Sequence, residues 1–177
     1  QAIAAEVPIK GRVLDYCAGG GGKSLALAAR ASAPIYAHDI AADRMGDIVP
    51  RAARGGHEIH TVLTDILTTT DPFDTILCDV PCSGSGAWRR APESKWALTE
   101  AELQDYVALQ RTVITNALKF LAPSGHFCYA TCSMFMQENQ KQRDWIVESF
   151  PNLSLAHELH VLPSSDADGL YIAVFSQ

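Results

Sequence analysis

The stretch RVLDYCAGGGGKS, residues Arg12 to Ser24, decides the fold that we predict. Its apolar beginning predicts a buried strand, Gly19–Gly22 a tight turn, and the Leu- and Ala-rich segment Lys23–Ala31 a helix. A second strand, Pro34–Ala37, is followed by Asp39, at the position where a nucleotide-binding α/β unit places an acid for ribose hydroxyls. The stretch therefore predicts an α/β unit that binds a nucleoside.

Two phosphate-binding patterns do not fit this glycine turn. The pattern G-x-x-x-x-G-K-[ST] needs a glycine where Cys17 stands, and G-x-G-x-x-G needs its last glycine at Ser24 or Leu25. The remaining features are an acid at Asp15, the glycine turn, and Asp39 after the next strand. We expect a nucleoside with little phosphate, such as S-adenosylmethionine, and rank an NTPase lower.

Strands and helices alternate along the rest of the chain. The predicted strands are Ile59–Leu63, Phe73–Cys78, His126–Ala130, Leu153–Leu162 and Leu170–Phe175. The predicted helices are Ala41–Arg54, broken at Pro50, a long helix from the capping box at Thr99 to about Leu121, and Gln137–Phe150. This order predicts a mostly parallel seven-stranded sheet with helices on both faces and an antiparallel last strand.

Two cysteine segments, DVPCSGSG (Asp79–Gly86) and YATCS (Tyr129–Ser133), each follow a short apolar run. Because ligands bind at the carboxyl ends of parallel strands, we expect Cys82 and Cys132 to face one site although they lie far apart in sequence. Cys78 and Cys128 lie inside the predicted strands, where a cysteine usually packs as a small apolar residue.

The five cysteines do not predict a disulfide framework, because their number is odd and the chain is too large to need one. Their repeated C-x-x-x-C spacing suggests zinc, but structural zinc is usually held by cysteines on tight turns rather than on strands. We expect reduced thiols and no metal.

The 177 residues fit one soluble, monomeric domain, and no apolar run is long enough to cross a membrane. Fourteen basic and twenty acidic residues give a net charge of −6, which excludes a surface that holds nucleic acid unaided. The most basic patch is WRRAPESKW, Trp88–Trp96. The N-terminus also lacks the basic-then-apolar pattern of a signal peptide, so we expect a cytoplasmic protein. The chain opens at Gln1 without an initiator Met, so we expect that an N-terminal, RNA-binding domain is missing.

Several motifs together resemble the RNA 5-methylcytosine methyltransferases of the Nop/Sun type, which include bacterial 16S rRNA methylases. VLDYCAGGGGKS resembles the family's cofactor loop, usually D-x-C-A-A-P-G-G-K-T, but has three glycines where Ala-Pro-Gly is commoner. The later matches, in chain order, are His38-Asp39, Thr64-Asp65, DVPCSGSG, RRAPESKW, YATCS with Glu138-Asn139, and DGLYIAVF at Asp168–Phe175. The resemblance covers nearly the whole chain and implies that residues 1–177 form a Rossmann-like, class I S-adenosylmethionine-dependent catalytic domain.

The family resemblance also implies the roles of individual residues. Cys132 would be the nucleophile that adds to cytosine carbon 6, and Cys82 would help to release the product. The implied cofactor contacts are Cys17, Ala18, Gly19, Gly20, Gly21, Gly22, Lys23, Asp39, Arg44, Asp65 and Asp79.

Carbon 5 of cytosine is too electron-poor to accept a methyl group unaided, so a nucleophile must first add to carbon 6. Other side chains would then stabilise this adduct. We expect Asp79 to hydrogen-bond cytosine nitrogen 3 and Lys23 to place positive charge near the thiolate or the base. Flanking RNA would be held by Trp88, Arg89, Arg90 and Lys95.

The expected substrate is rRNA of the 16S type, and three alternatives stay open. One is a tRNA cytosine-5 methyltransferase. Another is a DNA cytosine methyltransferase whose nucleophile is the cysteine of the proline-cysteine segment. The last is a scaffold that binds cofactor or RNA without turnover.

Overall fold

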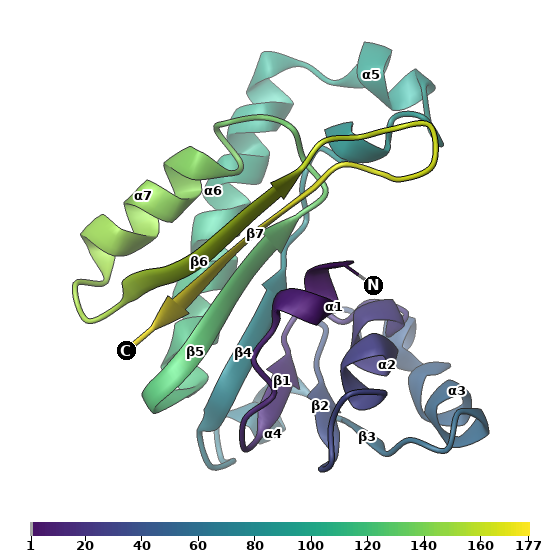
Figure 1. The fold of residues 1–177 in the computed structure, drawn as a ribbon, viewed down its shortest axis with the longest axis vertical. Coiled ribbons are helices and arrows are strands. Elements are labelled where there is room, and N and C mark those ends of the chain that lie inside the picture. The colour runs from purple at the N-terminus through teal and green to yellow at the C-terminus, as the bar shows by residue number, and fades with distance from the viewer. Residues whose placement is uncertain (1) are drawn as a thin grey trace.

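The computed structural model describes residues 2–177, which fold around one seven-stranded sheet (Figure 1). The strand order is β3-β2-β1-β4-β5-β7-β6. The strands are β1 (Val13–Asp15), β2 (Ile35–Ala37), β3 (Ile59–Thr61), β4 (Phe73–Asp79), β5 (Leu121–Thr131), β6 (Ser154–Val161) and β7 (Leu170–Ser176). The pairs from β3 to β5 are parallel, whereas β7 is antiparallel to both β5 and β6. This confirms the predicted sheet.

Helices cover both faces of the sheet (Figure 1). The α-helices are α1 (Ala2–Glu6), α2 (Gly22–Ala28), α3 (Ile48–Arg54), α4 (Thr64–Leu67), α5 (Glu93–Ala97), α6 (Glu100–Ala117) and α7 (Gln140–Ser149). The 3₁₀ helices are η1 (Ala42–Met45), η2 (Ser85–Ala87) and η3 (Leu118–Phe120). Helices α1, α2 and α3 pack on one face, and α4, α6 and α7 on the other.

The central strand β4 is buried on both sides, which is why its sequence is a continuous apolar run. Leu77 packs in the core with α2 and α3, whereas its neighbours Ile76 and Cys78 pack in the core with α6 and α7. All three side chains have no exposed surface. Replacing such a buried Leu or Ile with Ala costs about 2–5 kcal/mol, so this run fixes the middle of the sheet.

The predicted break at Pro50 is wrong. Pro50 is the third residue of α3, within the first helical turn, where a backbone N–H has no partner in the helix and its loss costs little. The segment is interrupted earlier instead, between η1 and α3 at Gly46-Asp47. The predicted helix over Ala41–Arg54 is therefore two short helices.

Other element boundaries also differ from the prediction. The short helices α1, α4 and α5 were not predicted, and α5 overlaps the basic segment Trp88–Trp96. Strand β5 begins at Leu121 rather than at His126, and a register shift accommodates the extra residues. The capping box is confirmed, since the backbone N–H of Thr99 donates to Glu102 Oε2 at 2.8 Å and the N–H of Glu102 donates to Thr99 Oγ1 at 3.3 Å.

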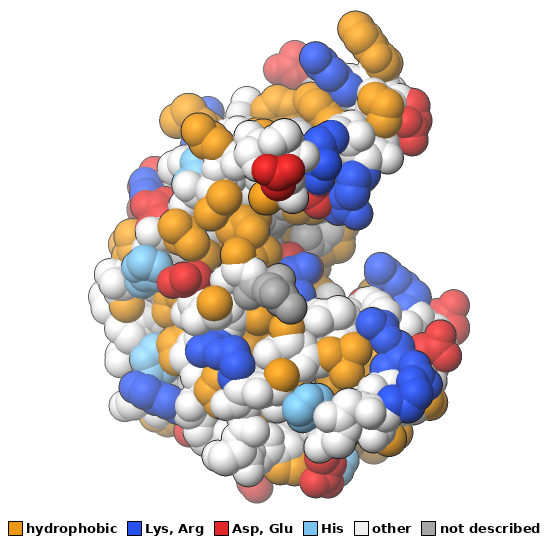
Figure 2. Space-filling view, turned by 45° about the vertical axis from the view of Figure 1, so that its right-hand side comes forward, with side chains coloured by type: hydrophobic (Ala, Val, Ile, Leu, Met, Phe, Trp, Pro, Cys, Tyr) orange, Lys and Arg blue, Asp and Glu red, His pale blue; other side chains and the backbone are white. Residues whose placement is uncertain are grey.

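One face of the molecule is hollowed by a deep notch (Figure 2). Lys and Arg side chains gather on both sides of this notch, although the whole chain carries net negative charge. Among residues 2–177, no helix is long and apolar enough to cross a membrane.

Candidate active site

The two cysteine loops meet at the carboxyl ends of adjacent strands. Cys82 lies in the loop after β4 and Cys132 directly after β5, and the two strands pair in parallel. The sulfur atoms of Cys82 and Cys132 are 3.4 Å apart, within hydrogen-bonding distance for thiols. The prediction that these two cysteines face one site is confirmed.

Gly86 allows the two loops to approach this closely. Its N–H donates to the carbonyl of Cys132 at 2.8 Å, and its own carbonyl accepts from the N–H of Gly169 at 2.9 Å. A Cβ at position 86 would collide with the carbonyl oxygens of Gly169 and Cys132. The position therefore requires glycine because backbone from two other loops touches it.

The two thiols differ in acidity although they form one hydrogen-bonded pair. The hydrogen bond from Cys82 lowers the pKa of Cys132 to about 7, helped by the nearby charge of Lys23 and opposed by burial. The same hydrogen bond raises the pKa of Cys82, together with burial and the charge of Glu138. Cys132 is thus the thiol that ionises near neutral pH, and Cys82 is the hydrogen-bond donor to its thiolate.

Lys23 and Asp79 form an ion pair beside the cysteines. Lys23 is the second residue of α2, directly after the glycine turn, and Asp79 is the last residue of β4. Burial raises the pKa of Asp79, and the charge of Lys23 opposes this rise. The carboxyl group is therefore held closer to its protonated form than a surface aspartate would be.

Asp15 is a fully buried acid at the end of β1. One of its oxygens accepts a hydrogen bond from Ser24 Oγ at 2.6 Å, while Oδ1 has no hydrogen-bond partner among residues 2–177. Burial raises the pKa of Asp15 to about 7. A buried carboxylate oxygen without a donor, next to a glycine turn, is suited to receive a ligand group that carries N–H or O–H.

The glycine turn is tied to Asp39 at the end of β2. The N–H of Gly19 donates to Asp39 Oδ2 at 2.8 Å, and that of Ala41 donates to Oδ1 at 3.0 Å. Gly21 has φ +80°, and a Cβ there would lie 2.6 Å from Ile48 Cγ1, so this turn also requires glycine. Each oxygen of Asp39 keeps a lone pair for a ribose hydroxyl.

The remaining predicted cofactor residues lie around the same turn. Arg44 Nη1 is 3.7 Å from Asp39 Oδ2, and Asp65 is exposed in the first turn of α4. The sequence reasoning gave no role to His38, which is 2% exposed and hydrogen-bonds the carbonyl of Tyr16 and the hydroxyl of Thr64. His38 thus links the segments that follow β1, β2 and β3. The only signal of this role in the sequence was its position beside Asp39.

The predicted RNA-binding residues lie on a separate segment, between η2 and the end of α5. Arg89 and Arg90 both approach Asp168, with nitrogen–oxygen distances of 3.7 and 2.6 Å. Trp88 is half-buried edge-on against Phe135, whereas Lys95 is exposed. Within residues 2–177 these side chains form no hydrogen bond or ion pair with the cysteine pair, and their part in RNA binding stays a prediction.

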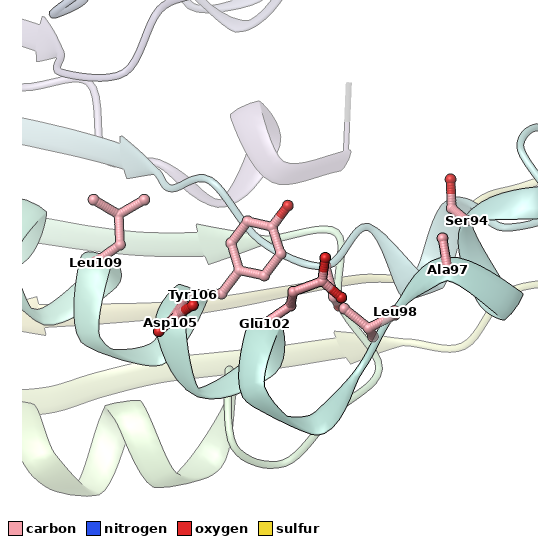
Figure 3. Close-up of a pocket in the computed structure, with 8 residues that line it drawn as sticks. Ser94, Ala97, Leu98, Glu102, Asp105, Tyr106 and Leu109 are labelled. Carbon is pink, nitrogen blue, oxygen red and sulfur yellow. The ribbon is translucent and has the colours of Figure 1, made fainter.

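A cavity of about 360 Å³ opens beside the first cysteine loop (Figure 3). Ser83 contributes to its wall and follows Cys82 directly in the chain. The other lining residues come from the α5 region and α6: Ser94, Ala97, Leu98, Glu102, Asp105, Tyr106 and Leu109. Among residues 2–177, no group of three or more His, Cys, Asp and Glu side chains is placed to hold a metal ion.

Known proteins resemble this chain over most of its length. Residues 6–176 match the family model described as 16S rRNA methyltransferase RsmB/F. Ribosomal RNA small subunit methyltransferase B of Shewanella oneidensis is 35% identical over 136 residues, which are 73% of this chain and 32% of that protein. Ribosomal RNA small subunit methyltransferase F of Escherichia coli O9:H4 is 30% identical over 188 residues, and the match covers 92% of this chain and 39% of that protein.

A solved structure confirms the fold. NSun6 from Pyrococcus horikoshii superposes with a TM-score of 0.78 over 99% of this chain and 50% of its own, at 21% sequence identity. The fold is thus the Rossmann-like fold of S-adenosylmethionine-dependent methyltransferases, as predicted. The chain spans about a third to two fifths of the length of the curated relatives named above. The match over residues 6–176 establishes that this chain belongs to the RsmB/F family of 16S rRNA methyltransferases.

Proposed function

We propose that this chain is the catalytic domain of an enzyme that transfers a methyl group from S-adenosylmethionine to carbon 5 of a cytosine in RNA. The observation that carries the proposal is the thiol pair, 3.4 Å apart, in which only Cys132 has a lowered pKa. Family membership makes small-subunit rRNA the expected substrate, as the names of the relatives indicate.

Cys132 begins the reaction in this proposal. Its thiolate adds to cytosine carbon 6, and the electrons of the carbon 5–carbon 6 double bond move toward nitrogen 3, which gives carbon 5 nucleophilic character. Asp79 would donate a hydrogen bond or a proton to nitrogen 3, and its raised pKa suits that role. Lys23 stabilises the Cys132 thiolate before it attacks.

The residues around the glycine turn fit a sulfonium nucleoside. Asp39 would accept from the ribose hydroxyls, and Asp15 Oδ1, which has no partner among residues 2–177, would accept from a ligand donor. Asp65, in the first turn of α4, would be a further contact. The turn itself offers backbone N–H groups but lacks the glycine spacing of a phosphate site. When bound there, S-adenosylmethionine would supply the methyl group that carbon 5 accepts.

Cys82 acts later in the proposed reaction. Its pKa is raised first of all because it donates a hydrogen bond to Cys132. Once the Cys132 sulfur is bonded to carbon 6 it carries no negative charge, so this cause disappears and the pKa of Cys82 falls. Cys82 then loses its own proton to solvent, and the resulting thiolate takes up the carbon 5 proton. As the carbon 5–carbon 6 double bond re-forms, the carbon 6–sulfur bond breaks, Cys132 leaves as a thiolate, and any proton that Asp79 gave to nitrogen 3 returns to it.

RNA binding would be shared with other parts of a longer protein. The chain is acidic overall, and Arg89 and Arg90 already have Asp168 as an ionic partner. They can still contact phosphates, since each guanidinium has five N–H donors. A domain outside this chain would therefore supply much of the affinity for RNA.

The test uses the full-length protein that contains this chain. Purified protein, tritiated S-adenosylmethionine and unmethylated small-subunit rRNA are expected to give labelled RNA, and bisulfite sequencing is expected to show one protected cytosine. If label were transferred to tRNA and not to rRNA, the proposed rRNA substrate would be wrong. Transfer to a position other than carbon 5 would overturn the proposed chemistry.

A further inference from the structure

Glu138 is a fully buried glutamate that lies between the two cysteine loops. It belongs to the turn that precedes α7. Its carboxylate accepts four hydrogen bonds, and three of them come from residues directly adjacent to the cysteines. Oε1 accepts from the N–H of Ser83 at 2.9 Å, and Oε2 accepts from the hydroxyls of Ser83 and Ser133, each at 2.5 Å.

Ser83 follows Cys82, and Ser133 follows Cys132. One carboxylate group therefore connects the residue beside each thiol, although the two loops are about fifty positions apart in sequence. Only an ionised carboxylate accepts four donors without offering one of its own. Hydrogen bonds to an ionised acceptor are also stronger than neutral ones, so they hold both loops firmly.

Glu138 is also hydrogen-bonded to one helix and one strand of the core, α6 and β5. The fourth hydrogen bond to the Glu138 carboxylate comes from the side-chain amide of Gln110 in α6, at 2.9 Å. The same amide also donates to the carbonyl of Pro81 at 3.0 Å. The hydroxyl of Tyr129 donates to the backbone carbonyl of Glu138 at 2.6 Å. Glu138 is thus hydrogen-bonded to α6 and β5 as well as to the two cysteine loops.

We propose that Glu138 is a positioning residue that sets the separation and orientation of Cys82 and Cys132. None of its hydrogen bonds within residues 2–177 reaches either sulfur, so it acts on their positions through Ser83 and Ser133. Its consequence for catalysis rests on the proposed function, in which the two thiols act in turn on one cytosine. A displacement of about 1 Å at a reacting group lowers a rate by about 100-fold, so the separation of the thiols matters to both steps.

The test compares Glu138→Gln with Glu158→Gln in the full-length protein. Glu158 is a matched control, because its carboxylate also accepts two strong hydrogen bonds, from Tyr171 at 2.5 Å and Arg143 at 2.7 Å. It lies on β6, and none of its hydrogen bonds within residues 2–177 reaches either cysteine loop. Each variant loses one hydrogen-bonded carboxylate, and thermal unfolding measures the loss of stability in each.

Two readouts separate positioning from stability. The first is steady-state methyl transfer, in which Glu138→Gln is expected to lower kcat by at least about 10-fold with KM for S-adenosylmethionine unchanged, while Glu158→Gln keeps kcat. The second is the rate at which diamide joins Cys82 and Cys132 in a disulfide, taking up their two electrons and two protons. This rate is expected to fall only in Glu138→Gln.

Equal kcat values and equal disulfide rates in the two variants would overturn the proposal. If Glu138→Gln does not fold, Ser133→Ala, which removes one donor to the carboxylate, replaces it, with the same outcomes expected. A wild-type protein that transfers no methyl group would refute the proposed function instead, and the disulfide rate would still test Glu138 by itself.

Discussion

Replacing Cys82 with Ala should change the pH dependence of Cys132 in a characteristic way. The substitution removes the hydrogen bond that is the largest cause of the low Cys132 pKa. The pKa of Cys132 should therefore rise from about 7 toward its ordinary value of 9.0. The charge of Lys23 remains, but burial opposes it.

Two effects on reactivity oppose each other, and their sizes decide the outcome. At pH 7 a thiol of pKa 7 is about half ionised and a thiol of pKa 9 about 1% ionised, a loss of about 50-fold. The more basic thiolate is about 6- to 10-fold more nucleophilic. Alkylation of Cys132 should thus be about 5- to 8-fold slower at pH 7 and about 3- to 5-fold faster at pH 9, so the two profiles cross near pH 8.

The assay is alkylation by iodoacetamide from pH 5 to pH 10, with the rate at Cys132 read by peptide mass spectrometry. Cys128, which is fully buried, serves as an internal control that should stay unmodified unless the protein unfolds. The pH at which the Cys132 alkylation rate is half its maximum should lie near 7 in the wild type and should rise in Cys82→Ala. A wild-type value near pH 9, or a value that Cys82→Ala does not change, would refute the acidity assigned to this pair.

Three further substitutions test the surroundings of the thiols. Gly21→Ala adds a Cβ against Ile48 at positive φ, so urea titration should show a free energy of unfolding lower by about 1–3 kcal/mol. Unchanged stability would contradict the claim that this turn requires glycine at position 21. Asp15→Asn removes an acid whose pKa burial raises from 3.8 to about 7, so its stability should increasingly exceed the wild type's from pH 4 to pH 7, then level off; a constant difference would count against this. Lys23→Met removes a positive charge, so Cys132 alkylation should shift to higher pH; a shift to lower pH would contradict its role.

The sequence was sufficient to predict the sheet and the meeting of the two cysteines. Buried parallel strands are continuous apolar runs, as in Thr75–Cys78, and parallel strands bring their carboxyl ends to one edge. The glycine turn and the acid after β2 were visible for the same reason, since both occupy fixed positions relative to a strand.

The features that sequence reasoning missed depend on tertiary contacts. Pro50 was expected to break a helix, but its effect depends on which turn of the helix it occupies. The contacts of Glu138 could not be predicted, because a buried glutamate is rare unless its donors come from distant segments. Likewise, the different acidity of Cys82 and Cys132 arises first from the hydrogen bond between them, and to a smaller extent from the charges of Glu138 near Cys82 and Lys23 near Cys132.

The most direct test of the central claim is covalent trapping with RNA that contains 5-fluorocytosine at the methylated position. Fluorine at carbon 5 cannot leave as a proton does, so the enzyme should remain bonded to the RNA after methyl transfer. We predict a denaturation-resistant adduct whose RNA-linked peptide contains Cys132, which Cys132→Ser abolishes and Cys82→Ala retains. An adduct attached to Cys82, or one that survives the loss of Cys132, would contradict the account.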